Sequence, residues 1–249
     1  MVVFRIPKPI SIIGENTSKS ITFATCNFSI AIDGSLDIGQ NYLCQSSKLL
    51  FDYLKESKET RKDEIIKNYH KTQNNAFFSK TISSTFGGLN YTTITEDSWF
   101  NIKLKANKVF NSYILAYEIN KTFFTNDMYN TENLLNPSIV EKMTSDFYDS
   151  YQKENWDFLG KLINGFWKIK REKYPESRNN YIDKLYSDCR LSGVIGGKMD
   201  GSTMILFVHP ENHEKIKSIM SDHILLNSSM DISGFVSQEV CSGISNCCE

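Results

Sequence analysis

The 249-residue sequence has almost no net charge, because its 28 basic and 29 acidic side chains leave a formal charge of −1. A groove for nucleic acid needs Lys and Arg gathered on one face among aromatic residues, and no such run occurs. No window approaches the roughly 18 apolar residues of a membrane span, and the strand-like start MVVFRI lacks the pattern of a secretory leader. We therefore expect no nucleic-acid partner, no membrane partner and a cytoplasmic location.

The sequence also lacks the spacing of histidines and cysteines that is typical of a metal site. The four histidines share no spacing that would place two of them on one ion, so we expect no metal site. Three of the six cysteines stand singly in apolar or helical surroundings, where a free thiol usually behaves as a small buried hydrophobe. These are Cys26, Cys44 and Cys189.

The other three cysteines, Cys241, Cys247 and Cys248, lie in the final stretch CSGISNCCE. Adjacent cysteines fit neither a CxxC zinc knuckle nor a CxxC redox pair. Small polar residues at a chain end favour flexibility, so we expect a flexible tail over 237–249. Modification, a metal clip and an intermolecular cross-link stay open as roles for its thiols.

The hydrophobic content of 40% is typical of a globular protein of one large or two small domains. The first half is predicted to contain strands over 2–6, 10–13 and 20–33, with Pro7 and Pro9 separating the first two, helices over 41–56 and 59–70, and a turn with a strand over 86–94. The second half is predicted to contain a strand over 111–119, a long helix from Pro137 with a break near 154–156, a helix over 178–190, a strand–turn–strand–helix unit over 190–216, and a closing strand over 223–236. This order indicates an α+β fold, with an antiparallel sheet covered by helices on one face.

Two glycine-bearing stretches are candidates for ligand contact. After the first strand, Gly-Glu-Asn-Thr over 14–17 places a carboxylate, an amide and a hydroxyl at the tip of a turn, where they could bind sugar hydroxyls. A plain turn has the same composition. Later, Gly-Gly-Lys over 196–198 and Gly-Ser-Thr over 201–203 would let backbone N–H groups approach an anion, and a tight hairpin is the alternative.

Four stretches carry a resemblance to a known family. They are RIPKPISIIGENTS, FGGLNY, FWKIKR and YIDKLYSDCRLSGVIGGKMDG. In this order they resemble motifs of the GHMP small-molecule kinases, and most closely those of the branch that phosphorylates D-glycero-D-manno-heptose 7-phosphate. The resemblance runs from about residue 3 to residue 236.

The resemblance implies an α+β, GHMP-kinase-like fold of two domains, a reduced ribosomal-S5-like domain over 1–104 and a ferredoxin-like domain over 105–236. It also implies ATP and Mg²⁺ as cofactors and an Asp that assists attack by a sugar hydroxyl. Carried over position by position, the substrate-binding residues are Arg5, Gly14, Glu15, Asn16, Thr17 and Ser18, and the nucleotide or phosphate residues are Gly39, Gly196, Gly197, Lys198, Gly201 and Ser202.

The sequence departs from the family where the chemistry is done. In place of a Gly- and Ser-rich phosphate loop it keeps Gly39 but carries bulky side chains over 41–44 and a negative charge at Asp37. Backbone N–H groups cannot wrap a triphosphate among such side chains. Lys80 stands where the branch has its Asp, and a charged lysine cannot accept a proton from a substrate.

Two further positions are altered. Ser18 replaces the Asp of the first motif, and the glycine run after Gly201 is shortened. We therefore predict a weak or inactive kinase of this family that keeps a role in binding a sugar phosphate or as a scaffold, with a protein partner or a homo-oligomer left open. The alternative is an active ATP-dependent sugar or sugar-phosphate kinase with a rearranged nucleotide site. In it Glu15 replaces the acid–base group, Lys80 or Lys198 contacts phosphate, and Ser46 and Ser47 supply hydroxyl groups.

Overall fold

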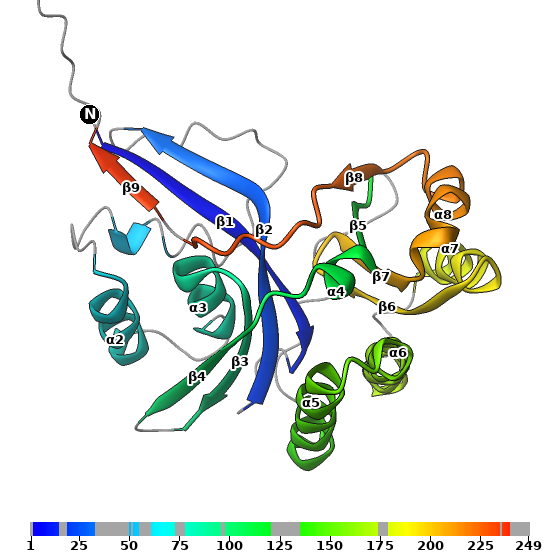
Figure 1. The fold of residues 1–249 in the computed structure, drawn as a ribbon, viewed down its shortest axis with the longest axis horizontal. Coiled ribbons are helices and arrows are strands. Elements are labelled where there is room, and N and C mark those ends of the chain that lie inside the picture. The colour runs from blue at the N-terminus through cyan, green and yellow to red at the C-terminus, as the bar shows by residue number, and fades with distance from the viewer. Residues whose placement is uncertain are drawn as a thin grey trace, which may run out of the picture.

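The computed structural model describes residues 2–14, 19–32, 50, 52–54, 61–72, 78–95, 98–120, 135–173, 179–234 and 236–239. Helices and strands carry the labels of Figure 1. Most of the expected helix over 41–56, and the part of the expected tail beyond Glu239, lie outside these residues. The first residues of the expected flexible tail, 237–239, are instead part of a strand, Val236–Glu239, that pairs with the N-terminal strand. Within them, no helix is both long enough and apolar enough to cross a membrane.

Five antiparallel strands form the first sheet, in the order β4-β3-β2-β1-β9. They are β1 (Val2–Ile13), β2 (Lys19–Ile32), β3 (Leu89–Ile94), β4 (Trp99–Leu104) and β9 (Val236–Glu239). The helices α2 (Lys62–Thr72) and α3 (Phe78–Phe86) lie on one side of this sheet, at the left of Figure 1.

Four antiparallel strands form the second sheet, in the order β6-β7-β5-β8. They are β5 (Ile114–Glu118), β6 (Val194–Asp200), β7 (Thr203–Val208) and β8 (Ile224–Leu226). The helices of this half are α4 (Lys108–Ser112), α5 (Pro137–Gln152), α6 (Trp156–Lys173), α7 (Asn180–Leu191) and α8 (His213–Ile219), with a 3-10 turn at Pro210–Asn212. In Figure 1, α7 and α8 lie at the outer side of the second sheet, and α5 and α6 lie below.

One large hydrophobic cluster joins the two sheets. It takes Ile10, Ile12 and Phe23 from the first sheet and Ile205 and Phe207 from the second, together with residues of α5 and α6. Burial of each such side chain contributes about 1.5–3 kcal/mol relative to leaving it in water. The shared cluster therefore fixes the sheets against each other and positions the residues at their junction.

Several boundaries fall where the sequence predicts them. Helix α5 begins at Pro137, where the missing N–H of a proline costs nothing, and the side chain of Asn136 caps it. The expected break falls at Glu154, whose φ of 54° interrupts the helical path before α6 begins at Trp156. The strand–turn–strand–helix unit over 190–216 is confirmed as β6, β7 and α8.

Two strand predictions were wrong. Pro7 and Pro9 do not separate two strands, because both lie within β1, at a point where its register with β2 shifts. A proline that cannot donate a ladder hydrogen bond is tolerated at such an irregularity. The closing strand over 223–236 is two strands, β8 and β9, which belong to different sheets. The segment 227–234 between them, here called the return segment, runs from the second sheet back to the first (Figure 1).

The close contact between β6 and α6 gives a test of the packing. A Cβ at Gly196 would lie 1.8 Å from the carbonyl oxygen of Gly160. We expect Gly196→Ala to lower the free energy of unfolding by about 3 kcal/mol, the upper part of the range for overpacking. The matched control is Gly165→Ala in α6, where the nearest atom, of Met143, lies 3.5 Å from the new Cβ. It should stabilise by about 0.5–1 kcal/mol, and equal effects in denaturant titrations would contradict the packing argument.

Candidate functional site

Three parts of the chain that the sequence links to chemistry meet at one ion pair. Lys80, in the first turn of α3, contacts Asp200, the last residue of β6, with 2.5 Å between Nζ and Oδ1. The other carboxylate oxygen, Oδ2, accepts a hydrogen bond of 2.9 Å from the backbone N–H of Ser11 in β1. The Asp200 side chain is 6% exposed and that of Lys80 is 18% exposed. Lys80, Asp200 and Ser11 are called the Lys80–Asp200 centre below.

The edge of β1 explains why Ser11 takes part. Strand β9 pairs with β1 only over Val2–Arg5, so no described strand covers this edge further along β1. A buried N–H group needs an acceptor, and Asp200 supplies one. The chain turns directly after Asp200 at Gly201, whose φ of 59° is a conformation that favours glycine. The β6–β7 hairpin therefore presents Asp200 to the open edge of β1.

A second buried ion pair joins the same strand to the second sheet. Lys8 of β1 contacts Glu118 of β5, with 2.8 Å between Nζ and Oε2, and neither side chain is more than 10% exposed. Glu118 also accepts hydrogen bonds from the hydroxyl groups of Ser202 and Thr203. Three donors on one carboxylate offset much of the cost of burying it. Through Ser202, this pair also holds the β6–β7 turn.

The glycines of the Gly-Gly-Lys motif lie inside β6 and not at a turn. Gly196 packs on α6 as described above, and a Cβ at Gly197 would lie 2.6 Å from the carbonyl oxygen of Ile205. Close packing accounts for both glycines, and their role in binding phosphate stays a prediction. Gly201 and Ser202, in contrast, form the turn next to the Lys80–Asp200 centre.

The third residue of that motif is also buried. Lys198 is 1% exposed, and its Nζ lies 5.3 Å from the centre of the Phe166 ring. This is the geometry of a cation–π contact, which gains strength where water is excluded. Lys198 thus has a described role within the core of the second half, and a contact with phosphate stays a prediction.

The first glycine turn is described in part. Gly14 follows β1 with a φ of 78°, again a conformation that favours glycine. It lies about 10 Å along the strand from Ser11, at the usual rise of a β-strand. The remaining predicted turn and loop residues lie outside the described part of the chain: Glu15, Asn16, Thr17, Ser18 and Gly39.

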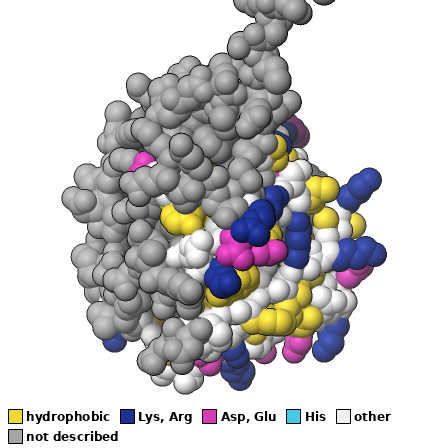
Figure 2. Space-filling view, turned by 90° about the vertical axis from the view of Figure 1, so that its left-hand side faces the viewer, with side chains coloured by type: hydrophobic (Ala, Val, Ile, Leu, Met, Phe, Trp, Pro, Cys, Tyr) yellow, Lys and Arg dark blue, Asp and Glu magenta, His cyan; other side chains and the backbone are white. Residues whose placement is uncertain are grey.

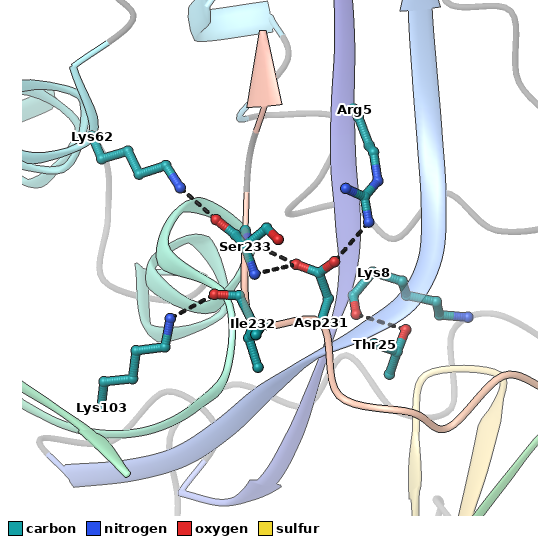
Figure 3. A network of polar contacts seen from close by, with 9 residues as sticks. Arg5, Lys8, Thr25, Lys62, Lys103, Asp231, Ile232 and Ser233 are labelled. Atoms are coloured by element: carbon teal, nitrogen blue, oxygen red, sulfur yellow. Dashed lines mark hydrogen bonds and ion pairs between the residues drawn. The ribbon is translucent and has the colours of Figure 1, made fainter. Parts of the chain in front are cut away.

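Arg5 is not part of the Lys80–Asp200 centre. It lies about 20 Å along β1 from Ser11 at the usual rise per residue. Its Nη2 contacts Oδ2 of Asp231 at 2.7 Å, as Figure 3 shows. Asp231 is 3% exposed and also accepts hydrogen bonds from the backbone N–H groups of Ser233 and Gly234. Arg5 thus holds the return segment, and its role as a substrate contact stays a prediction.

Two lysines hold the return segment from the opposite side (Figure 3). Lys62 donates to the carbonyl oxygen of Ser233, and Lys103 donates to those of Ile232 and Phe86. Burial lowers the pKa of both lysines, and the charge of Lys103 lowers the pKa of Lys62 further. These lysines replace water as donors to carbonyl groups that no sheet or helix satisfies.

The motif FGGLNY has a structural role at the same place. A Cβ at Gly87 would lie 2.4 Å from the backbone nitrogen of Gly234, so the return segment packs directly on this turn. The side-chain amide of Asn90 donates to the carbonyl oxygens of Gly87 and Gly88 and to the hydroxyl of Ser83. The motif thus fixes the end of α3 relative to β3.

Charges on the described surface are interspersed. On the face shown in Figure 2, Lys and Arg side chains lie among Asp, Glu and apolar side chains, with no gathering of one sign. Within the described residues no group of three or more His, Cys, Asp or Glu could hold a metal ion. Among the described residues, opposite charges meet in local pairs, such as Arg171 with Asp183 at 2.5 Å.

Sequence reasoning missed Ser11 and the acidic residues of both buried pairs. Asp200 stands in the GGKMDG stretch, one residue before the turn glycine, and Glu118 ends the apolar run ILAYE. A charged residue at the end of an apolar strand was the available signal. The partner of each acid could not be predicted from the sequence, because Lys80 and Lys8 lie far along the chain from Asp200 and Glu118.

A double-mutant cycle tests the Lys80–Asp200 pair. Lys80→Met leaves the Asp200 carboxylate buried without its cation, so we expect the free energy of unfolding to fall by about 3 kcal/mol. Asp200→Asn keeps an acceptor for the Ser11 N–H, and the double variant should lose about 1–3 kcal/mol less than the sum of the single losses. Lys217→Met, which breaks the exposed contact with Glu214, is the control and should change stability little. Additive losses would contradict the pairing.

No family model and no curated protein matches the sequence. Solved structures do match, among them a D-glycero-D-manno-heptose 1-phosphate kinase from Bacteroides thetaiotaomicron, at a TM-score of 0.70 and 10% identity over 97% of this chain and 100% of that one. A candidate sugar kinase from Campylobacter jejuni matches at 0.68 and 12% identity, over 96% and 98%. A mevalonate diphosphate decarboxylase from Staphylococcus aureus matches at 0.62 and 10% identity, over 96% and 99%. These similarities do not single out the heptose branch, and they show that the chain has the α+β, GHMP-kinase-like fold, built here from two antiparallel sheets and their helices.

Proposed function

We propose that this protein binds a sugar or a sugar phosphate and transfers phosphoryl groups weakly or not at all. The fold, shared with solved structures of a candidate sugar kinase and a heptose phosphate kinase, supports the ligand class. The Lys80–Asp200 pair is the observation that supports the loss of transfer. The turn after β1 is the proposed contact for sugar hydroxyls, with Gly14, Glu15, Asn16, Thr17 and Ser18.

The argument against transfer starts from the charge of Lys80. The related kinases place a carboxylate at this position, according to the motif resemblance, and here an ammonium lies 2.5 Å from a buried acid. A lysine that is ion-paired keeps its proton, so it cannot act as a general base. Phosphoryl transfer depends on positioning and charge neutralisation, and the loss of one such group costs orders of magnitude in rate.

The phosphate loop supports the same conclusion. Its sequence keeps Gly39, but bulky side chains over 41–44 replace small residues that let backbone N–H groups surround a triphosphate, and it adds the charge of Asp37. Among the described acids near the centre, Asp200 and Glu118 each already hold a lysine. This donor set does not fit Mg²⁺, which prefers carboxylates free to bind it together with substrate phosphates. ATP with Mg²⁺ therefore remains a cofactor pair implied by the fold alone.

The chain also divides, in our proposal, into domains over 1–104 and 105–236. The first sheet and α2 and α3 belong to the first domain, apart from β9, and the second sheet belongs to the second. The return segment brings the chain back across this boundary. Ligand contacts from both domains would then meet near the Lys80–Asp200 centre.

A second candidate function is an active sugar kinase with a rearranged site. The observation that favours it is Asp200, which places a buried carboxylate next to the position that Lys80 occupies. Such a carboxylate could take the proton of a sugar hydroxyl if Lys80 released it. Glu15 is the other acid for this role, and it lies outside the described residues.

Ligand binding and turnover separate these functions. We expect heptose 7-phosphate or hexose 6-phosphate to raise the melting temperature of the native protein, since a ligand that binds only the folded state stabilises it. We expect ADP to leave the melting temperature unchanged, and magnesium-ATP to give no turnover of either sugar phosphate. Saturable protection by ADP together with turnover at about 1 s⁻¹ or faster would establish the active kinase instead.

If the protein proves to be an active kinase, the variant Asp200→Asn tests whether Asp200 is its general base. If Asp200 accepts the substrate proton, its replacement should lower kcat by about 10²–10⁴ with a smaller effect on KM. A weakly active native protein whose rate is unchanged in Asp200→Asn would exclude Asp200 as the base. Thermal melts of the unligated variant control for loss of folding.

A further inference from the structure

The groups that hold Asp200 are groups that also bind phosphate. The ammonium of Lys80 contacts one carboxylate oxygen at 2.5 Å, and the N–H of Ser11 donates to the other at 2.9 Å. Cationic side chains and backbone N–H groups are the usual donors to phosphate oxygens. The carboxylate therefore occupies an anion-binding position that is built by other parts of the chain, α3 and β1.

One donor of this position has no acceptor. Ser11 is 1% exposed, and among the described residues its hydroxyl has no hydrogen-bond partner. The Oγ and the backbone nitrogen of one serine are joined through Cα and Cβ, which keeps them within roughly 4 Å of each other. The orphan hydroxyl thus lies beside the N–H group that Asp200 already accepts from. A buried hydroxyl without a partner is unfavourable and calls for an explanation.

The direction of the acceptor oxygens supplies the explanation. A carboxylate has two oxygens, and Asp200 directs one to Lys80 and the other to the Ser11 N–H. A phosphate monoester has three terminal oxygens, each a strong acceptor. It could accept one hydrogen bond from the Lys80 ammonium, one from the Ser11 N–H and one from the Ser11 hydroxyl. A phosphate thus offers the Ser11 hydroxyl an acceptor oxygen, which the aspartate in its described position does not.

At Gly201, the turn that follows Asp200 does not pack against other described parts of the chain. Asp200 ends β6, and Gly201 follows it in a turn where no heavy atom of the described chain lies within 4 Å of the place of a Cβ. Rotation of the Asp200 side chain about its Cα–Cβ bond leaves the β6–β7 ladder in place. The Glu118 contacts with Ser202 and Thr203 hold the rest of the turn while this happens.

We propose that Asp200 is an internal placeholder for the phosphate group of a phosphorylated ligand, which displaces its carboxylate from Lys80 and Ser11. This inference rests on the proposed function and adds the chemical class of the ligand, a phosphate monoester, and the donors that bind it. Because the displaced carboxylate still repels a dianion nearby, Asp200 also lowers the affinity of the native protein. An unphosphorylated sugar has no group that exchanges with it.

Inorganic phosphate is the first probe, because it carries the shared chemistry without a sugar. Asp200→Asn removes the competing charge and keeps an acceptor for the Ser11 N–H. At constant ionic strength with chloride as the control anion, we expect the apparent Kd for phosphate, from thermal melts, to fall about tenfold or more relative to the native protein. The double variant Lys80→Met/Asp200→Asn should lose this binding.

Ser11→Ala tests the orphan hydroxyl. Since that hydroxyl has no partner among the described residues, its removal should leave the melting temperature of the unligated protein unchanged or raise it. In the Asp200→Asn background it should raise the apparent Kd for phosphate about three- to tenfold, the usual effect of one lost hydrogen bond. A lower melting temperature with unchanged phosphate affinity would overturn the proposal.

The outcomes separate this inference from the proposed function. Equal phosphate affinity in the native protein and Asp200→Asn overturns the placeholder, even if a hexose 6-phosphate stabilises the native protein. If phosphate binds Asp200→Asn tightly while no sugar or sugar phosphate affects either protein, the placeholder stands and the proposed function is wrong. If Asp200→Asn does not fold, Ser11→Ala in the native chain gives the same test, with hexose 6-phosphate as the probe and the unphosphorylated hexose as the control.

Discussion

The junction between the two sheets depends on two carboxylates that are buried against lysines. Asp200 forms an ion pair with Lys80, and Glu118 forms one with Lys8. Both acids lie on strands of the second sheet, and both lysines lie on elements of the first half. Ion pairs of this kind contribute little net stability, because desolvation cancels most of the attraction. The hydrophobic cluster that joins the sheets supplies the stability. The ion pairs favour this alignment of the hairpin and β1, because a shifted alignment would leave the largely buried side chains of Lys8, Glu118 and Asp200 without their partners.

The positions of the lysine and the aspartate at this junction bear on the chemistry of the candidate site. In a kinase of this fold, the resemblance leads one to expect a free carboxylate on the helix and glycines around a triphosphate. Here the helix carries the cation, the hairpin carries the acid, and the Gly-Gly pair of β6 serves packing on α6 and β7. In our proposal, such a centre holds an anion in place and does not deprotonate a hydroxyl.

The sequence predicts those helix boundaries that depend on interactions between neighbouring residues. The start of α5 at Pro137 and the break at Glu154 depend on neighbouring residues, and both were predicted. Helix α3 was missed because its sequence, FSKTISSTF, is rich in Ser and Thr, which are indifferent helix formers. Burial against β1 and β2 stabilises it, and only the folded chain shows that contact.

The residues of the candidate site could be predicted only where a local motif marks them. Position 80 was identified from its motif, but its partner lies far along the chain and has no sequence signal that names it. The stretch 223–236 was predicted as one strand because both its ends are apolar. Its two ends belong to different sheets, and the return segment between them is held by Asp231 and by packing on the glycine turn after α3. The turn over 15–18 and the loop around Gly39 lie outside the described residues, so their predicted roles are untested.

The pairing of β9 with β1 has a consequence for how the chain folds during synthesis. Val2 lies opposite Glu239, so an edge of the first sheet is completed by a strand that leaves the ribosome long after β1. Contacts so distant in sequence slow folding, because the intervening chain must be ordered before they form. Until β9 pairs, the N–H and C=O groups of β1 over Val2–Arg5 stay exposed as a strand edge, which favours association with other chains.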